Sequence, residues 1–126
     1  MGFILGALLL SACEDLPNIP PTASFIYSPV APIYAGQTSV VFNASLSKDS
    51  DGDILRYHWN FGDGSGEVDT DQSVITHVFP DTGARCVEAT YTVLLIVTDN
   101  QQGTTAASEQ VKVIELPVPG SAECPK

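Results

Sequence analysis

The sequence YHWNFGDG at residues 57–64 decides the fold of this chain. Tyr57, Trp59 and Phe61 alternate with polar residues, and this period of two is typical of a strand with one buried face. Trp59 gives that face a large apolar area on which two sheets can close. The glycines on either side of Asp63 allow the backbone to reverse directly afterwards, and Asp63 can accept hydrogen bonds from amides of the turn. The stretch therefore predicts a core strand that ends in a sharp turn.

Similar alternation extends along the chain on both sides of this strand. Strands are expected at residues 22–28, 38–45, 55–61, 73–79, 91–98 and 104–114. Leu55 is expected on the same face as Trp59, and His77 is expected in phase with Phe79 on an inner face. Turn-forming residues such as SKDSDGD (47–53) separate the strands, and no helical spacing occurs after residue 13. Short alternating strands at such intervals predict an all-β sandwich of about seven antiparallel strands over residues 22–114.

The composition narrows the classes of function. The chain has 126 residues, with 5 Lys and Arg against 15 Asp and Glu, which gives a formal net charge of −10. Nucleic acids and anionic lipid surfaces attract clustered Lys and Arg, so neither is an expected partner. A chain of this length forms one domain of ordinary size, and its sequence contains no Gly-x-Ser-x-Gly or zinc-ligand spacing. We therefore expect a binding or structural module and not an enzyme.

The first residues form a separate segment. Residues 2–12 are uncharged and mostly apolar, but such a helix would rise only about 16 Å and could not cross a bilayer core of about 30 Å. Residues 1–12 fit a secretory signal whose basic start is missing. Leu10-Ser11-Ala12-Cys13 resembles the bacterial lipobox, which implies acylation of Cys13 and an extracytoplasmic protein anchored to the bacterial membrane or cell surface. A chance cysteine after a cleaved signal, or a buried N-terminal helix, is the alternative.

The remaining cysteines suggest a disulfide. Residues 13–21 are acidic and Pro-rich and are expected to form a tether, while residues 115–126 are expected to form an irregular tail. With Cys13 acylated, Cys86 and Cys124 are left as a pair in an oxidising compartment. A Cys86–Cys124 bridge would close a loop of about 38 residues and stabilise the fold by roughly 4 kcal/mol. Two free thiols are the alternative.

Six stretches together resemble one family. They are residues 21–25 (PTASF), 41–45 (VFNAS), 47–53 (SKDSDGD), 57–64 (YHWNFGDG), 77–79 (HVF) and 91–99 (YTVLLIVTD). Over about residues 20–113 the chain resembles the PKD domain (the polycystic-kidney-disease-type repeat), which implies an immunoglobulin-like β-sandwich. The residues that match the fold signature are Trp59, Phe61, Gly62, Asp63, Gly64 and Tyr91.

The chain departs from the family pattern before the penultimate strand. The family normally has a glycine almost directly before the tyrosine that opens this strand, whereas residues 84–90 separate Gly83 from Tyr91 here. This insertion contains Cys86. We interpret it as a loop that is stapled to the tail.

An acidic turn is the candidate metal site. Asp49, Asp51 and Asp53 alternate in it, and the loop that begins at Asp99 is expected at the same end of the sandwich. The resemblance implies a calcium site, because some PKD domains of secreted enzymes bind calcium through ligands that match Asp49, Asp51 and Asp99. Asn18 is the nearest oxygen donor in the entry segment. Calcium takes roughly six to eight oxygen ligands. A solvated acidic turn without metal is the alternative.

The outer face of the strand at residues 91–98 is a candidate contact surface. Leu94 and Ile96 are expected to point outward, since successive side chains of a strand alternate between faces. They would lie beside His58 and form an apolar patch on an acidic module, and such patches tend to mark contact surfaces. The tail at residues 115–126 could instead cover them.

These features predict a lipid-anchored, extracytoplasmic module for protein interaction or scaffolding, an accessory subunit of an envelope or surface assembly. Its partner would be a protein, and acyl chains on Cys13 would hold it at the membrane. A polysaccharide-binding module or a calcium-stabilised spacer is the alternative. Carbohydrate sites usually stack sugars on exposed aromatic rings, and Tyr34 is the one obvious candidate in this sequence.

Overall fold

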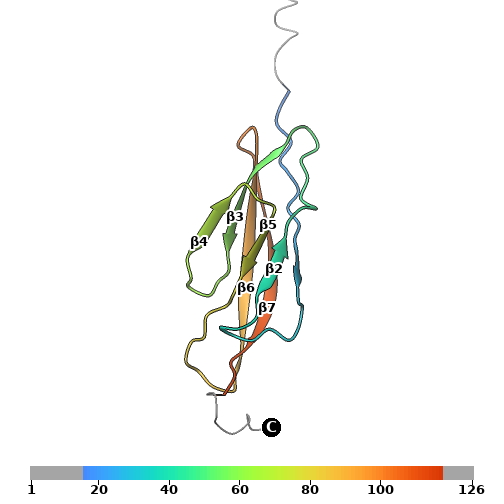
Figure 1. The fold of residues 1–126 in the computed structure, drawn as a ribbon. Coiled ribbons are helices and arrows are strands. Elements are labelled where there is room, and N and C mark those ends of the chain that lie inside the picture. The colour runs from blue at the N-terminus through green and yellow to red at the C-terminus, as the bar shows by residue number, and fades with distance from the viewer. Residues whose placement is uncertain (1–15, 118–126) are drawn as a thin grey trace, which may run out of the picture.

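The computed structural model describes residues 16–117 as a sandwich of two antiparallel sheets (Figure 1). The strands are β1 (Ile26–Ser28), β2 (Val40–Asn43), β3 (Ile54–Asn60), β4 (Glu67–Thr70), β5 (Val74–His77), β6 (Glu88–Asp99) and β7 (Thr104–Ile114). One sheet has the order β1-β2-β5 and the other the order β4-β3-β6-β7. The predicted all-β sandwich is confirmed. Within residues 16–117 no helix is long and apolar enough to cross a membrane.

The core lies between the two sheets and follows the predicted alternation. Val93, Leu95 and Val97 of β6 are fully buried. The register pairs Trp59 of β3 with Leu95, so both side chains point inward. Phe42 of β2 approaches from the opposite sheet, and its ring centroid lies 5.7 Å from that of Trp59. Inward-facing side chains of both sheets therefore form one apolar layer between them.

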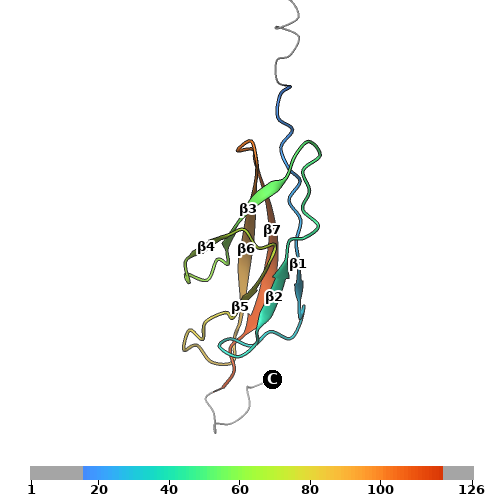
Figure 2. The ribbon, with the colours of Figure 1, turned by 45° about the horizontal axis from the view of Figure 1, so that its top comes forward.

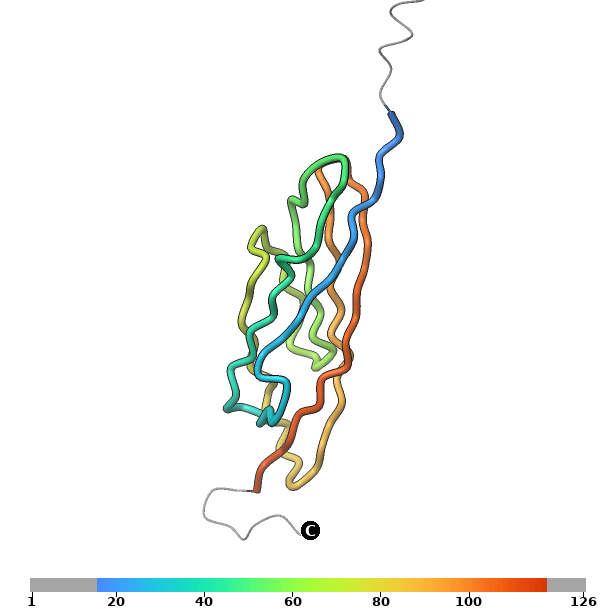
Figure 3. The backbone as a smooth tube through the Cα atoms, turned by 90° about the vertical axis from the view of Figure 1, so that its right-hand side faces the viewer, coloured from blue at the N-terminus to red at the C-terminus, as the bar shows by residue number. Residues whose placement is uncertain are grey.

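The sandwich is elongated, and the described chain enters at one end and leaves at the other (Figures 1 and 2). The entry segment is joined to the acidic turn by a bridge between Thr22 and Lys48. After β1 the chain crosses to the other sheet, where Tyr34 makes a parallel bridge with Ile114 of β7. Figure 3 shows the N-terminal segment running along the same side of the sandwich as β7. This path places β1 and β7, the terminal strands of the two sheets, on one side of the sandwich, which is called the β1–β7 side below.

The prediction for Leu55 was wrong. Leu55 was expected in the core, but it is 51% exposed. The register of β3 against β6 shifts between Ile54 and Arg56, which is the effect of an extra residue in one strand. Ile54 packs against the core in its place.

Strand β4 was not among the predicted segments. Glu67, Val68 and Asp69 are all exposed, and only Thr70 is half-buried. A strand without alternating burial leaves no periodic signal in the sequence. It forms because its backbone pairs with β3, with Trp59 opposite Val68.

Candidate functional site

The acidic end of the sandwich is organised around Asp99, the last residue of β6. Its Oδ1 accepts hydrogen bonds from the backbone amides of Gln101 (2.8 Å) and Gly103 (2.7 Å), and its Oδ2 accepts one from Nδ2 of Asn18 (2.7 Å). Burial alone would raise the pKa of Asp99, but these hydrogen bonds stabilise the carboxylate and hold the pKa below its usual value. Asp99 is therefore an ionised group that fixes both its own loop and the entry segment.

Two further contacts tie the entry segment to this end. The backbone amide of Ile19 donates to Oδ2 of Asp51 over 2.9 Å. Gly103 leaves just enough space for Asn18, since a Cβ at Gly103 would lie 2.5 Å from Nδ2 of Asn18. The structure thus brings Asn18, Asp51 and Asp99 together, as the sequence predicted for the two carboxylates.

Asp49 lies in the same cluster and differs from its neighbours. Both carboxylate oxygens are shielded from solvent without a hydrogen-bond partner among the described residues, and the same holds for Oδ1 of Asn18. Burial raises the pKa of the Asp49 carboxyl, and the nearby carboxyl of Asp51 and the negative charge of Asp99 raise it further, whereas the backbone of Asp51 acts to lower it. Unpartnered buried oxygens are costly, and a bound cation is one way to satisfy them.

The carboxylates of this cluster do not form a metal site by themselves. Among residues 16–117 no group of three or more His, Cys, Asp and Glu side chains is arranged to hold a metal ion. Calcium also accepts amide and backbone oxygens, and Oδ1 of Asn18 supplies an amide oxygen here. The side chain of Asp53 takes no part in these contacts, and its backbone amide donates a hydrogen bond to Oδ1 of Asn100 over 3.2 Å.

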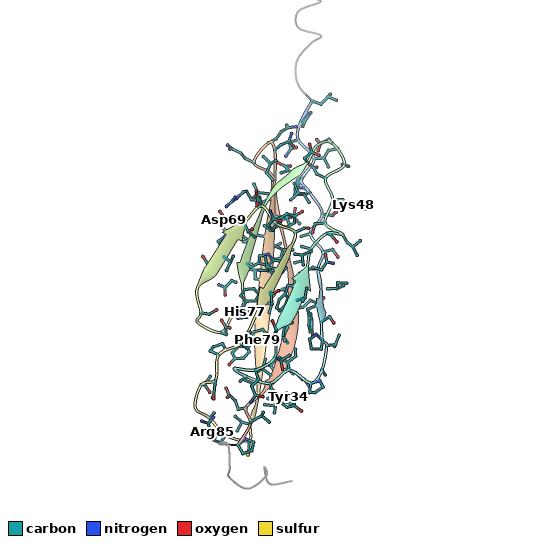
Figure 4. The ribbon with its side chains drawn as sticks, in the orientation of Figure 1. Tyr34, Lys48, Asp69, His77, Phe79 and Arg85 are labelled. Carbon is teal, nitrogen blue, oxygen red and sulfur yellow. The ribbon has the colours of Figure 1, made fainter. Side chains whose placement is uncertain are left out.

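A second polar centre lies at the turn after β3. Nε2 of His77 is 2.6 Å from Oδ2 of Asp63, and the two side chains are 14% and 1% exposed. Oδ1 of Asp63 accepts hydrogen bonds from the amide and the hydroxyl of Ser65. The ring of His77 stacks on Phe61 with centroids 3.8 Å apart. His77 and Phe79 lie in the middle of the sandwich, away from Lys48 at one end and from Tyr34 and Arg85 at the other (Figure 4).

The sequence placed His77 in the core and gave Asp63 a role in the turn, but it did not pair them. Burial acts to raise the pKa of Asp63, and the hydrogen bonds from Ser65 and His77 outweigh it, so the pKa is lowered. A buried histidine requires a polar partner, and this requirement was the available signal. The pair joins β5 to the turn that leaves the opposite sheet, which makes it a structural contact between the sheets.

Leu94 and Ile96 of β6 lie on the outer face of their sheet, as the alternation along the strand predicted. His58 is opposite Ile96, and Asn60 is opposite Leu94, so these residues share the outer face of the four-stranded sheet. Leu94 and Ile96 are half-buried. On the β4 side the patch is bordered by charge, because Nε2 of His58 lies 3.2 Å from Oε2 of Glu67.

The inserted segment is only partly a loop. Residues 88–90 belong to β6, and Glu88 pairs with Ile114. Cys86 is held against the end of β7, since its amide donates to the carbonyl of Glu115 over 2.9 Å. The buried carboxylate of Glu115 in turn accepts a hydrogen bond from Oγ1 of Thr82 (2.8 Å). Cys13 and Cys124 lie outside the described residues, so acylation and the disulfide stay predictions.

The PKD domain family model matches residues 18–114. The chain belongs to the PKD domain family. PKD domains are in general non-catalytic modules. The family assignment agrees with the order of the strands and with the turn after Trp59, where Gly62 has a φ of 72° and a Cβ would lie 2.5 Å from the carbonyl oxygen of Thr92.

Three proteins are similar to this PKD domain. Collagenase ColA of Clostridium perfringens (strain 13 / Type A) is 37% identical over 79 residues, which are 63% of this chain and 6% of the collagenase. A structure solved to explain the promiscuous specificity of carbohydrate-binding modules of the β-sandwich superfamily is 39% identical, with a TM-score of 0.68 over 79% of this chain and 36% of that chain. The PKD1 domain of Vibrio anguillarum Epp is 27% identical, with a TM-score of 0.58 over 80% of this chain and 100% of that domain. The chain therefore spans a small part of the first two proteins.

The pair of Asp63 and His77 generates a prediction about pH. Because the pKa of Asp63 is lowered in the folded state, its stabilising contribution is present above the ordinary aspartate pKa and is lost as the pH falls through the lowered value. Asp63→Asn should cost about 1–3 kcal/mol at neutral pH and should flatten the loss of stability in acid. Urea denaturation at a series of pH values measures both effects. Asp71→Asn, at an exposed position, is the control. If the free energy of unfolding falls equally in acid for both variants and the parent, the prediction is contradicted.

Proposed function

We propose that this PKD domain is a non-catalytic, extracytoplasmic module that is lipid-anchored through Cys13 and presents a rigid surface to a protein partner of an envelope or surface assembly. The main support is the attachment of the entry segment. Asn18 and Ile19 are hydrogen-bonded to Asp99 and Asp51 at one end of the sandwich, and the described chain leaves at the opposite end. A domain held in this way keeps a fixed direction relative to the chain that would lead to the anchor.

The outer face of the four-stranded sheet is the proposed contact surface. Leu94 and Ile96 lie side by side with His58, and a partner that covered them would remove half-buried apolar area from water. The similarity to a part of Clostridium perfringens collagenase agrees with a secreted setting. That match covers little of the collagenase, so its activity carries no weight for this chain.

A calcium-stabilised spacer is the second candidate, and one observation favours it. Three oxygens of Asp49 and Asn18 are buried without hydrogen-bond partners among the described residues. A cation bound to these oxygens would lie close to Asp51 and Asp99, at the point where the entry segment meets the domain. Such an ion would strengthen the link that fixes the direction of the tether.

The anchor is tested by intact-mass analysis of protein extracted with detergent from the native host. We expect a chain that begins at acylated Cys13 and lacks the thiol hydrogens of Cys86 and Cys124, because these two are proposed to form a disulfide. Cys13→Ser should move the protein from the membrane fraction to the aqueous fraction. An unmodified Cys13 in a membrane-bound chain would rule out this anchor, and recovery of both thiols would rule out the bridge.

The contact surface is tested by chemical cross-linking in cells followed by identification of the attached protein. The double variant Leu94→Thr and Ile96→Thr should lower recovery of the cross-linked partner at least about tenfold, as expected when a central apolar contact is lost. Val41→Thr with Val74→Thr is the matched control, since both valines are exposed on the opposite sheet. Equal recovery with the two double variants would exclude the Leu94 and Ile96 surface.

The calcium site is tested by thermal unfolding in excess calcium and in chelator. Calcium should raise the melting temperature by several degrees, because it binds only the folded state. Asp49→Asn removes a carboxyl whose pKa is raised by burial and by nearby carboxylates. Because the charged form of this carboxyl is unfavourable without a cation, the variant should have a higher melting temperature in chelator, and its melting temperature should not respond to calcium. Asp71→Asn should respond as the parent does. If calcium does not change the melting temperature of the parent chain, the proposal of a calcium-stabilised spacer is refuted.

A further inference from the structure

An apolar groove lies on the β1–β7 side of the sandwich, between the edge strands of the two sheets. It has a volume of about 220 Å³ and is lined by Phe25, Ile26, Tyr27 and Val30 on one side and by Glu109 of β7 on the other. Ile26 and Val30 are 59% and 68% exposed. Because β1 and β7 are the terminal strands of their sheets, the groove has an unextended sheet edge along each wall.

The backbone of β7 offers hydrogen bonds along this edge. The amide and carbonyl of Ile114 bond to Ile33 and Ala35 on the side away from β6, whereas those of Glu115 bond to Val87 and Cys86 on the β6 side. Since successive residues of a strand direct these groups to opposite sides, the even-numbered residues of β7 face the open edge.

Part of that edge has no backbone partner. The carbonyl of Gln110 accepts a hydrogen bond from the hydroxyl of Tyr27 (3.3 Å). The amides and carbonyls of Ala106 and Ser108 make no backbone hydrogen bond toward this side among residues 16–117. An exposed row of such groups is a template for an additional strand.

Glu109 gives the groove a charge. It is opposite Val93 in the β6–β7 register, and Val93 is fully buried, so the side chain of Glu109 lies on the inner face and at the groove. No described residue forms an ion pair with it. A carboxylate beside an apolar groove favours a ligand that combines an apolar side chain with a cationic one.

We propose that the edge of β7 at Ala106 and Ser108 binds an extended segment of a partner protein by strand addition, with one apolar side chain in the groove and a Lys or Arg beside Glu109. The proposal rests on the proposed function, because it names a second surface and the chemistry of the partner for the same interaction module. Backbone hydrogen bonds would supply affinity, and the groove with Glu109 would supply selectivity.

A second copy of this chain fits the edge less well. Pairing of β7 with itself would bring the Glu109 residues of two chains toward one another, and each chain has a formal net charge of −10. An inward-pointing charge on an edge strand is a common protection against such self-pairing. The same charges attract a basic segment.

A carbohydrate also fits less well. Sugars stack on flat exposed rings, but Tyr27 packs against Phe42 with ring centroids 5.8 Å apart, and its hydroxyl is bound to Gln110. The exposed wall of the groove is made by the aliphatic Ile26 and Val30. These side chains match an apolar residue of a peptide.

The experiment is an NMR titration of the full chain that carries Cys13→Ser. The main probe is the blocked peptide Thr-Val-Thr-Lys-Thr-Val-Thr. The same peptide with Glu in place of Lys is the second probe, and a cello-oligosaccharide is the third. We expect saturable shifts at the groove and slower hydrogen exchange of the Ala106 and Ser108 amides with the Lys peptide. Binding of the oligosaccharide in the groove without the peptide, or peptide-induced shifts outside it, would overturn the proposal.

Charge reversal supplies the decisive control. Glu109→Lys should weaken binding of the Lys peptide about tenfold and strengthen binding of the Glu peptide by a similar factor, because one close charge pair contributes about that much to affinity. Asp71→Lys makes the same change in net charge on an exposed turn and should alter neither affinity more than about twofold. Equal effects of the two variants would refute the role of Glu109. Ser108→Pro removes a backbone amide that faces the edge and is not bonded to β6, so it should abolish peptide binding. Thermal unfolding of this variant shows whether the domain still folds.

The outcome is separable from that of the proposed function. Failure of the peptide to bind would remove strand addition but would leave the acyl anchor and the Leu94 and Ile96 surface to their own measurements. Conversely, loss of either of those would not alter the groove titration, which uses a chain without the anchor.

Discussion

The contact of Trp59 with aromatic rings from the opposite sheet is the interaction on which the rest of the structure depends. Its side chain is fully buried, and its ring lies 5.1 Å from Phe25 and 5.7 Å from Phe42, measured between centroids. Both phenylalanines come from the side of the three-stranded sheet, whereas Trp59 belongs to the four-stranded sheet. Apolar burial of this size is the main favourable term in folding, and these ring contacts join the two sheets at the centre of the core.

The polar contacts lie at positions that this packing leaves open. Asp63 and His77 pair beside Phe61, where the turn after β3 approaches β5, and the carboxylate is ionised because its hydrogen bonds outweigh its burial. At the acidic end, Asp99 likewise gathers three donors, but Asp49 keeps its oxygens buried and unpartnered. The first arrangement is complete by itself. The second is incomplete in the described part of the chain, and this difference separates a structural pair from a candidate binding site.

The β1–β7 side of the sandwich and its acidic end have different roles in the proposals. The acidic end receives the entry segment through Asn18 and Ile19, so it controls how the domain is oriented. The β1–β7 side has an unextended backbone edge and the carboxylate of Glu109, so it is suited to a partner.

The sequence by itself determined which residues form the core and most of the strands. Alternation with a period of two is a local property, and it was sufficient for the inward faces of β5, β6 and β7 and for the turn at Gly62. The sequence also predicted Asp51 and Asp99 at the same end of the sandwich, because the family pattern places the loops that contain them at that end.

Only the tertiary structure decided the features that depend on register and on the meeting of distant segments. The shift between Ile54 and Arg56 turned Leu55 outward, and β4 exists because its backbone found a partner in β3. The pairing of Asp63 with His77 and the groove between Tyr27 and Glu109 likewise join residues far apart in the chain. Local patterns fix the direction of a side chain relative to its own strand, but closure of the two sheets fixes which side chain it meets.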